Sequence, residues 1–136
     1  MITDASGTPL RVVATGGNRH DVTQLLPLVD AVGPVRGIRG RPRRKPRRVY
    51  ADRAYDHDRY RRGLRQRGIT ARIARRGQEH GSGLGRLRWV AEAALAWLHG
   101  PRRLRIRWEV RDDIHDGFLQ LAHCMILAGK LPATAF

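Results

Sequence analysis

The feature that most constrains this fold is a short apolar run that ends abruptly in a carboxylate. Val49, Tyr50 and Ala51 favour a β-strand, Asp52 follows them directly, and a turn-rich segment comes next. We interpret the run as a buried strand with Asp52 at its carboxyl end. In open α/β sheets, ligands and metal ions bind outside the carboxyl ends of the strands. Asp52 is therefore a better candidate for chemistry than an acid in the middle of a helix.

The residues that follow predict two parallel strands joined by a helix. Residues 57–67 have a helical pattern, with Asp56 in position to cap the helix and Gly68 as a natural stop. Residues 69–73 then alternate apolar and polar side chains, as in a strand with one face covered. The order strand, helix, strand favours a parallel pair and an α/β fold.

The first part of the chain predicts a hairpin and one more helix. Residues 1–3 and 10–14 read as strands around a tight turn, and a first strand this short suggests that an amino-terminal portion is missing. Asp21 can cap a helix that runs to Val32, with Pro27 close to its start. We therefore expect a sheet that is incomplete at its amino-terminal end.

Two helices are predicted in the last third of the chain. In residues 86–99 the apolar side chains share one stripe, and Glu92 lies off that stripe with Arg88 one turn before it. Such a glutamate is more often a solvated partner of an arginine than a metal ligand. Residues 114–128 form the final helix. Four side chains make up its predicted apolar face: Ile114, Phe118, Leu121 and Met125.

The charge of the chain predicts a polyanionic partner, with nucleic acid as the first choice. The formal net charge is +15, and of 27 basic residues only Lys45 and Lys130 are lysines. Guanidinium groups suit phosphate because they offer a flat fork of donors. A GC-rich coding sequence could account for part of the arginine excess.

Two basic stretches are the candidate DNA contacts. Residues 36–48 combine arginine with glycine and proline, which predicts an irregular basic loop, either a phosphate-binding arm or a solvated linker. Residues 102–107 form a second basic stripe. The predicted DNA-binding residues are Arg41, Arg43, Arg44, Lys45, Arg47, Arg48, Arg102, Arg103 and Arg105.

Several classes of protein do not fit the composition. A single cysteine, Cys124, excludes an internal disulfide and a cysteine-based zinc site, and the six histidines lack zinc-site spacing. No run approaches the roughly 18 apolar residues of a membrane span, and the first residues do not form a signal peptide. We expect a cytoplasmic, nucleoid-associated protein without a membrane partner.

Asp52 and Glu92 together could hold a divalent cation for phosphodiester chemistry. Mg²⁺ prefers carboxylate oxygens and keeps part of its shell for water and phosphate. Two such ions, about 4 Å apart, can stabilise the attacking and leaving oxygens of a phosphodiester. The positions of two acids in a sequence do not establish such a site alone.

Six segments, spread over nearly the whole chain, carry a resemblance to a known family. They are GNRHDVT (17–23), VYADRAYD (49–56), IARRG (73–77), RWVAE (88–92), AWL (96–98) and RRLRIR (102–107). In this order they resemble the carboxyl-terminal half of DDE transposases of the insertion-sequence-five family. The resemblance implies a ribonuclease-H-like fold, a mixed sheet flanked by helices, in which three acids bind two Mg²⁺ or Mn²⁺ ions. It also implies nicking of DNA by water and then attack of a 3′-hydroxyl on target DNA.

By this resemblance, Asp52 is similar to the second acid and Glu92 to the third, while Arg88 matches an arginine that accompanies the glutamate. The first acid, expected on a strand before the hairpin, has no counterpart. Other departures from the family pattern are Gly85, Ala93, Ala94, Leu95, His99 and Ala54. We therefore expect residues 1–136 to be one partial catalytic domain, with the basic loop 36–48 inside it, that is inactive by itself. A homodimer is possible.

Two alternatives to a transposase domain stay open. The chain could be a basic nucleic-acid-binding protein without catalysis, in which Asp52 and Glu92 are ordinary acids. It could also be a remnant without function, for which low solubility or oligomerisation would be typical. Metal binding through Asp52 and Glu92 would separate the first alternative from a working site.

Overall fold

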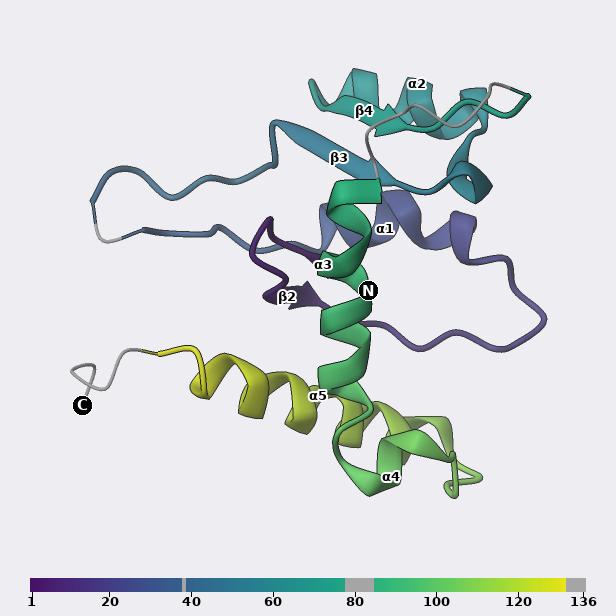
Figure 1. The fold of residues 1–136 in the computed structure, drawn as a ribbon, viewed down its shortest axis with the longest axis vertical. Helices are drawn as coiled ribbons and strands as arrows, with labels where there is room; N and C mark the ends of the chain where they lie inside the picture. Colours follow the sequence, from purple (N-terminus) through teal and green to yellow (C-terminus); the bar gives the residue numbers. More distant parts are fainter. Residues whose placement is uncertain (38, 78–84, 132–136) are drawn as a thin grey trace. The chain divides into compact units, whose positions relative to one another are not determined.

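The computed structural model describes residues 1–37, 39–77 and 85–131, and the chain divides into two compact units. Thr15–Arg86 form one unit, which we call the crossover unit. Met1–Ala14 and Leu87–Phe136 form the other, the hairpin unit. Each unit contains its own strands and helices (Figure 1). The fold is mixed α/β with two small sheets, and a ribonuclease-H-like arrangement of them stays a prediction.

The crossover unit is built on two parallel strands, as the sequence predicts. Strands β3 (Arg48–Ala51) and β4 (Thr70–Ile73) pair with Val49 opposite Ala71, and helix α2 (Asp58–Gln66) connects them (Figure 1). Gly68 ends α2 with a φ of +69°, a left-handed conformation that glycine adopts without steric cost. The predicted strand, helix and stop are confirmed.

Helix α2 packs through a face on which Leu64 is completely buried. Next to it, Gly63 lies against Leu26 of helix α1 (Leu25–Asp30). A Cβ atom at position 63 would come within 2.6 Å of Leu26 Cδ1. The missing side chain therefore allows α1 and α2 to approach closely.

The entry to α1 differs from the predicted single helix. A 3₁₀ turn, η1 (Asp21–Gln24), precedes α1, His20 occupies the cap position instead of Asp21, and α1 ends at Asp30. Pro27 explains the difference. In an α-helix that began at Asp21, the nitrogen of Pro27 would face the Thr23 carbonyl with no hydrogen to donate.

The hairpin unit begins with strands β1 (Ile2–Thr3) and β2 (Pro9–Arg11), which pair in antiparallel fashion. Asp4 Oδ1 accepts hydrogen bonds from the backbone nitrogens of Ser6 and Thr8, at 2.9 and 2.8 Å, and so holds the turn. The predicted hairpin is confirmed, although its second strand is shorter than the predicted 10–14.

Three helices complete the hairpin unit: α3 (Gly85–Leu98), α4 (Arg102–Arg105) and α5 (Asp112–Ala128). Its core is a small cluster formed by Val12, Leu98, Leu104 and Ala122. His123 of α5 lies 2.7 Å from the Pro9 carbonyl oxygen, which links the last helix to β2. On α3 the predicted apolar stripe is buried at Val90, Ala94 and Leu98.

The predicted buried face of α5 is wrong for three of its four residues. Ile114, Leu121 and Met125 are 44%, 57% and 62% exposed, whereas Phe118 packs against the core. Ala122 and His123 are instead the buried residues of this helix. Apolar residues occur all round α5, so their periodicity could not select the side that faces the core.

Glu79, His80 and Ser82, in the polar stretch before α3, lie outside the described residues, as do residues 132–136. Within the part that is described, no helix is long and apolar enough to cross a membrane.

Candidate metal centre and nucleic-acid interface

Asp52 stands directly after β3, as the sequence predicts. It is exposed and forms the amino-terminal cap of a 3₁₀ turn, η2 (Arg53–Tyr55), in which Asp52 Oδ1 accepts a hydrogen bond from the Ala54 nitrogen at 2.7 Å. Val49 is buried inside the strand, but Tyr50 is 47% exposed, so β3 is covered on one face only. The carboxylate therefore projects from a fixed position at the strand end.

The turn that carries Asp52 is held in place by Asp56. Asp56 Oδ1 accepts from Arg61 Nε at 2.6 Å, and Asp56 Oδ2 accepts from the Arg76 backbone nitrogen at 2.8 Å. Hydrogen bonds from Arg76 and Arg61 hold the pKa of Asp56 below its ordinary value. The side chains of this ion pair are only 9% and 12% exposed. Asp56 thereby connects the turn to α2 and to the end of β4.

This arrangement corrects the prediction that Asp56 caps α2. His57 occupies the cap position and makes no side-chain capping bond. Asp56 does not cap the helix because Arg61 and Arg76 engage both of its carboxylate oxygens. Arg61 also donates to the Ile73 carbonyl at 2.8 Å, and Arg76 donates to the Ala54 carbonyl at 3.1 Å. Arg61 and Arg76 are positioning residues that the sequence analysis missed, since their partners lie between 5 and 22 positions away and follow no helical or strand spacing.

Tyr55 is a further neighbour of Asp52 that the sequence analysis missed. Burial raises the pKa of its phenol, and the negative charges of Asp21 and Asp52 raise it further. Both carboxylates thus act on the same side chain.

Glu92 lies on α3 and is exposed, with a side chain that is 61% accessible. Its Oε1 atom accepts from Arg88 Nε at 2.8 Å, which confirms that the two residues share one face of the helix. An exposed ion pair of this spacing contributes about 0.3–0.5 kcal/mol, so it holds Glu92 only loosely.

Asp52 and Glu92 belong to different units, and their approach to one metal ion stays a prediction. Their carboxylate oxygens are the donors that Mg²⁺ and Mn²⁺ prefer. Among residues 1–37, 39–77 and 85–131, no group of three or more histidine, cysteine or acidic side chains gathers as a metal site would need. The two carboxylates are suitable ligands for a divalent ion. They correspond to two of the three acids that the family resemblance implies.

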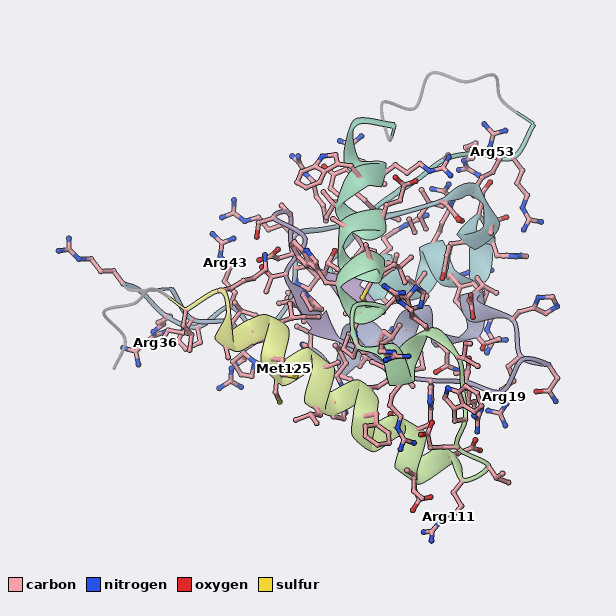
Figure 2. The ribbon with its side chains drawn as sticks, turned by 60° about the horizontal axis from the view of Figure 1, so that its bottom comes forward. Arg19, Arg36, Arg43, Arg53, Arg111 and Met125 are labelled. Atoms are coloured by element: carbon pink, nitrogen blue, oxygen red, sulfur yellow. The ribbon has the colours of Figure 1, made fainter. Side chains whose placement is uncertain are left out.

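Among residues 36, 37 and 39–47 the basic loop is irregular, as predicted, apart from one bridge in which the backbones of Val35 and Arg43 exchange two hydrogen bonds; Arg48 already belongs to β3. Figure 2 shows the side chains of Arg36 and Arg43 extending from this loop. Lys45 differs from its neighbours because its Nζ donates to the Arg67 carbonyl at 2.9 Å. A cation at this position stabilises the carboxyl-terminal end of α2.

The second basic stretch forms the short helix α4, and two of its three predicted DNA contacts have partners within the hairpin unit. Arg103 pairs with Glu109 at 2.7 Å and lies 5.3 Å from the centre of the Phe118 ring. Arg105 Nε donates to the His99 carbonyl at 3.1 Å. The hydrogen bond from Arg103 holds the pKa of Glu109, whose side chain is 5% exposed, below its ordinary value. Contact of α4 with DNA stays a prediction.

Comparison with known proteins places the chain in a family. The chain is 61% identical over 126 residues to a Burkholderia cepacia protein named "Putative transposase for insertion sequence element IS402". That alignment covers 93% of this chain and 60% of the relative, so the chain spans about three fifths of that protein's length. No solved structure matches. Residues 1–127 match the family described as "Transposase DDE domain". The chain therefore belongs to the DDE transposase family.

Proposed function

We propose that the chain is the carboxyl-terminal part of a catalytic domain for DNA transposition of an insertion sequence. Asp52 and Glu92 would be its metal-binding and catalytic acids, with Arg88 supporting Glu92. The observation that carries the proposal is Asp52 at the carboxyl end of β3, inside a stretch that matches a DDE domain. A carboxylate at this place can receive a metal ion from the open side of a sheet.

The chemistry of this site is nicking and transfer of DNA strands. A bound Mg²⁺ or Mn²⁺ supplies positive charge where negative charge develops on a phosphodiester. Asp52 would offer the carboxylate oxygen that the Ala54 nitrogen does not engage, and Asp56 would keep the turn fixed through Arg61 and Arg76. Catalysis depends on such fixed positions because small displacements of the acids lower the rate.

We expect the 136-residue chain alone to bind metal weakly and to be inactive in strand nicking. Two carboxylates give fewer ligands than the three acids of the family, and Mg²⁺, a small ion, demands a nearly octahedral set of ligands. Among the described residues, β3 pairs with β4 alone. A ribonuclease-H-like sheet would place a strand with an additional acid at the other edge of β3. We also expect a cytoplasmic, nucleoid-associated protein with DNA as its partner.

Binding of Mn²⁺, measured by electron paramagnetic resonance, tests the proposal. We expect the wild-type chain to bind Mn²⁺ weakly, and the Asp52→Asn and Glu92→Gln variants each to weaken that binding. Asp58→Asn is the matched control because Asp58 lies in the same unit and is 85% exposed. Equal Mn²⁺ binding by wild type and the double variant would contradict the proposal.

A nucleic-acid-binding protein without catalysis is the second candidate, supported by the charge of the crossover unit. Residues 15–86 contain 19 basic and six acidic residues, a net charge of +13. This candidate predicts DNA binding that is the same with Mn²⁺ and with a chelator. A functionless remnant would instead aggregate, which its exposed Trp108 and Val110 would favour.

A further inference from the structure

The arginines of α2 are of two kinds, and the distinction is visible only in the folded chain. Arg61 pairs with Asp56, and Arg67, which ends the helix, forms two hydrogen bonds to the carboxylate of Asp30 at 2.7 and 2.6 Å. Arg67 also donates to the Gly63 carbonyl at 3.0 Å. These two arginines have partners inside the crossover unit and stabilise it.

Three other arginines, Arg59, Arg62 and Arg65, are exposed and form what we call the outer arginine face. None of them has a carboxylate partner within the described ranges of the chain. The Arg59 guanidinium carbon lies 5.8 Å from the centre of the Tyr60 ring. The guanidinium groups of the face are therefore available to an external anion.

The spacing of the outer arginine face suits a phosphate backbone. Residues three apart in a helix are neighbours on its surface, and positions 59, 62 and 65 extend about 9 Å along the helix axis. One strand of duplex DNA places a phosphate about every 3.4 Å along its own axis. Three guanidinium groups spread over this length can contact several phosphates of one strand.

Without a bound anion, repulsion among the arginines of this face destabilises α2, and the helix itself is held firmly in the unit. Like charges three and four positions apart destabilise a helix. Asp58 is the acid nearest in sequence, but it is 85% exposed and has Arg75 at 3.9 Å. On the opposite side, α2 is fixed by the complete burial of Leu64. The arginines therefore project from a fixed support, which lowers the entropy lost on binding compared with the loop 36–48.

We propose that the outer arginine face of α2 binds the backbone of duplex DNA without reading its sequence. The choice of DNA among polyanions rests on the proposed function, whereas the surface itself rests on the contacts above. Arginine contacts to phosphate position a protein on the duplex and carry no base information. The face adds a rigid contact to the predicted loop contacts and is separate from Asp52 and Glu92.

The test measures binding to a fluorescent DNA duplex of mixed sequence by anisotropy, in a chelator, over about 50 to 200 mM salt. In the triple variant R59Q/R62Q/R65Q we expect the slope of log affinity against log salt to fall by about one per arginine. We expect the dissociation constant at about 0.1 M salt to rise at least about tenfold. R59K/R62K/R65K should restore the slope, since lysine keeps the charge.

The charge-matched control is R11Q/R107Q/R111Q, which removes three arginines from the hairpin unit. It should change the salt slope by much less than the α2 variant. Equal slopes for the two triple variants would overturn the inference, because net charge alone would then explain binding. Glutamine supports helices well, so R59Q/R62Q/R65Q should unfold at the wild-type temperature or above. A lower unfolding temperature, together with lost binding that the lysine variant does not restore, would also overturn it.

The outcome is independent of the metal site because the measurement is made without metal. Weaker DNA binding by R59Q/R62Q/R65Q, combined with unchanged Mn²⁺ binding by the Asp52 and Glu92 double variant, would support the face and contradict the proposed function. Unchanged DNA binding by R59Q/R62Q/R65Q, combined with lost Mn²⁺ binding by the Asp52 and Glu92 double variant, would contradict the role of the face and support the proposed function. Equal competition by double-stranded RNA of the same length would overturn the assignment of DNA as the partner.

Discussion

The two units use arginine in opposite ways. The crossover unit has a net charge of +13, while the hairpin unit, with eight basic and six acidic residues, has +2. In the hairpin unit Arg103, Arg107 and Arg111 each pair with an acid close in sequence. In the crossover unit most of the basic residues of the loop 36–48 and of the outer arginine face have no such partner among the described residues. Arginine content alone therefore does not locate a nucleic-acid surface, because arginines that are alike in the sequence differ, among the described residues, in whether an acid pairs with them.

The units also differ in how they bury apolar side chains, and this gives the largest expected effect. Leu64 of α2 is completely buried, whereas Leu121 of α5 is 57% exposed. Leu64→Ala should lower the free energy of unfolding by about 2–5 kcal/mol. Leu121→Ala should change it by less than about 0.5 kcal/mol. Urea denaturation of both variants measures this difference. A large loss in Leu121→Ala would mean that the outer side of α5 is covered in solution.

The second prediction compares two basic stretches that look alike in the sequence. R41Q/R43Q/R44Q, in the loop, should weaken DNA binding at least about tenfold near 0.1 M salt, because its side chains are exposed. R102Q/R103Q/R105Q removes the same charge but breaks the Arg103 pair with Glu109. It should lower the unfolding temperature and weaken DNA binding less. Fluorescence anisotropy and thermal unfolding are measured for both variants. A greater loss of DNA binding in R102Q/R103Q/R105Q than in R41Q/R43Q/R44Q would contradict this prediction.

The third prediction concerns acid pH. Asp56 in the crossover unit and Glu109 in the hairpin unit have pKa values below their ordinary 3.8 and 4.5, because hydrogen bonds favour their charged forms. A carboxylate with a lowered pKa stabilises the fold above its unfolded pKa, and this stability is lost as the pH falls through the folded pKa. Asp56→Asn and Glu109→Gln should each flatten the fall of the unfolding temperature below about pH 4.5.

Hydrogen exchange assigns each acid to its unit. In Asp56→Asn the amides of α2 and β4 should lose protection at neutral pH, and in Glu109→Gln those of α4 and α5. If either variant lowered protection in both units equally, the division into two units would not describe their stability.

The smallest expected effect is on the free energy of unfolding, and it comes from a comparison of two ion pairs with nearly the same spacing in the sequence. Arg61 and Asp56 are 12% and 9% exposed, whereas Arg88 and Glu92 are 78% and 61% exposed. Arg88→Ala should change the free energy of unfolding by at most about 0.5 kcal/mol. Arg61→Ala should have a larger effect, because it leaves a buried carboxylate with fewer partners. Equal effects in thermal unfolding would show that burial does not distinguish the pairs.

The sequence predicted the local structure of the crossover unit well. Residues 49–52 and 69–73 predict the parallel pair, and Gly68 predicts the end of α2, because strand propensity, alternation and glycine act between near neighbours. The place of Asp52 after β3 followed from the same local pattern. The resemblance to DDE transposases came from short segments in a fixed order, and the family match over residues 1–127 confirms it.

Only the tertiary structure decided which side chains have partners. It assigned Asp56 to Arg61 and Arg76 rather than to the cap of α2, and it turned Leu121 and Met125 away from the core (Figure 2 labels Met125). It also separated the paired arginines of α2 from the exposed ones. The physical reason is that local propensity depends on residues within a few positions. Ion pairing and burial depend on how the elements pack in space, even for partners as close in sequence as Asp56 and Arg61, and a single sequence does not contain those distances.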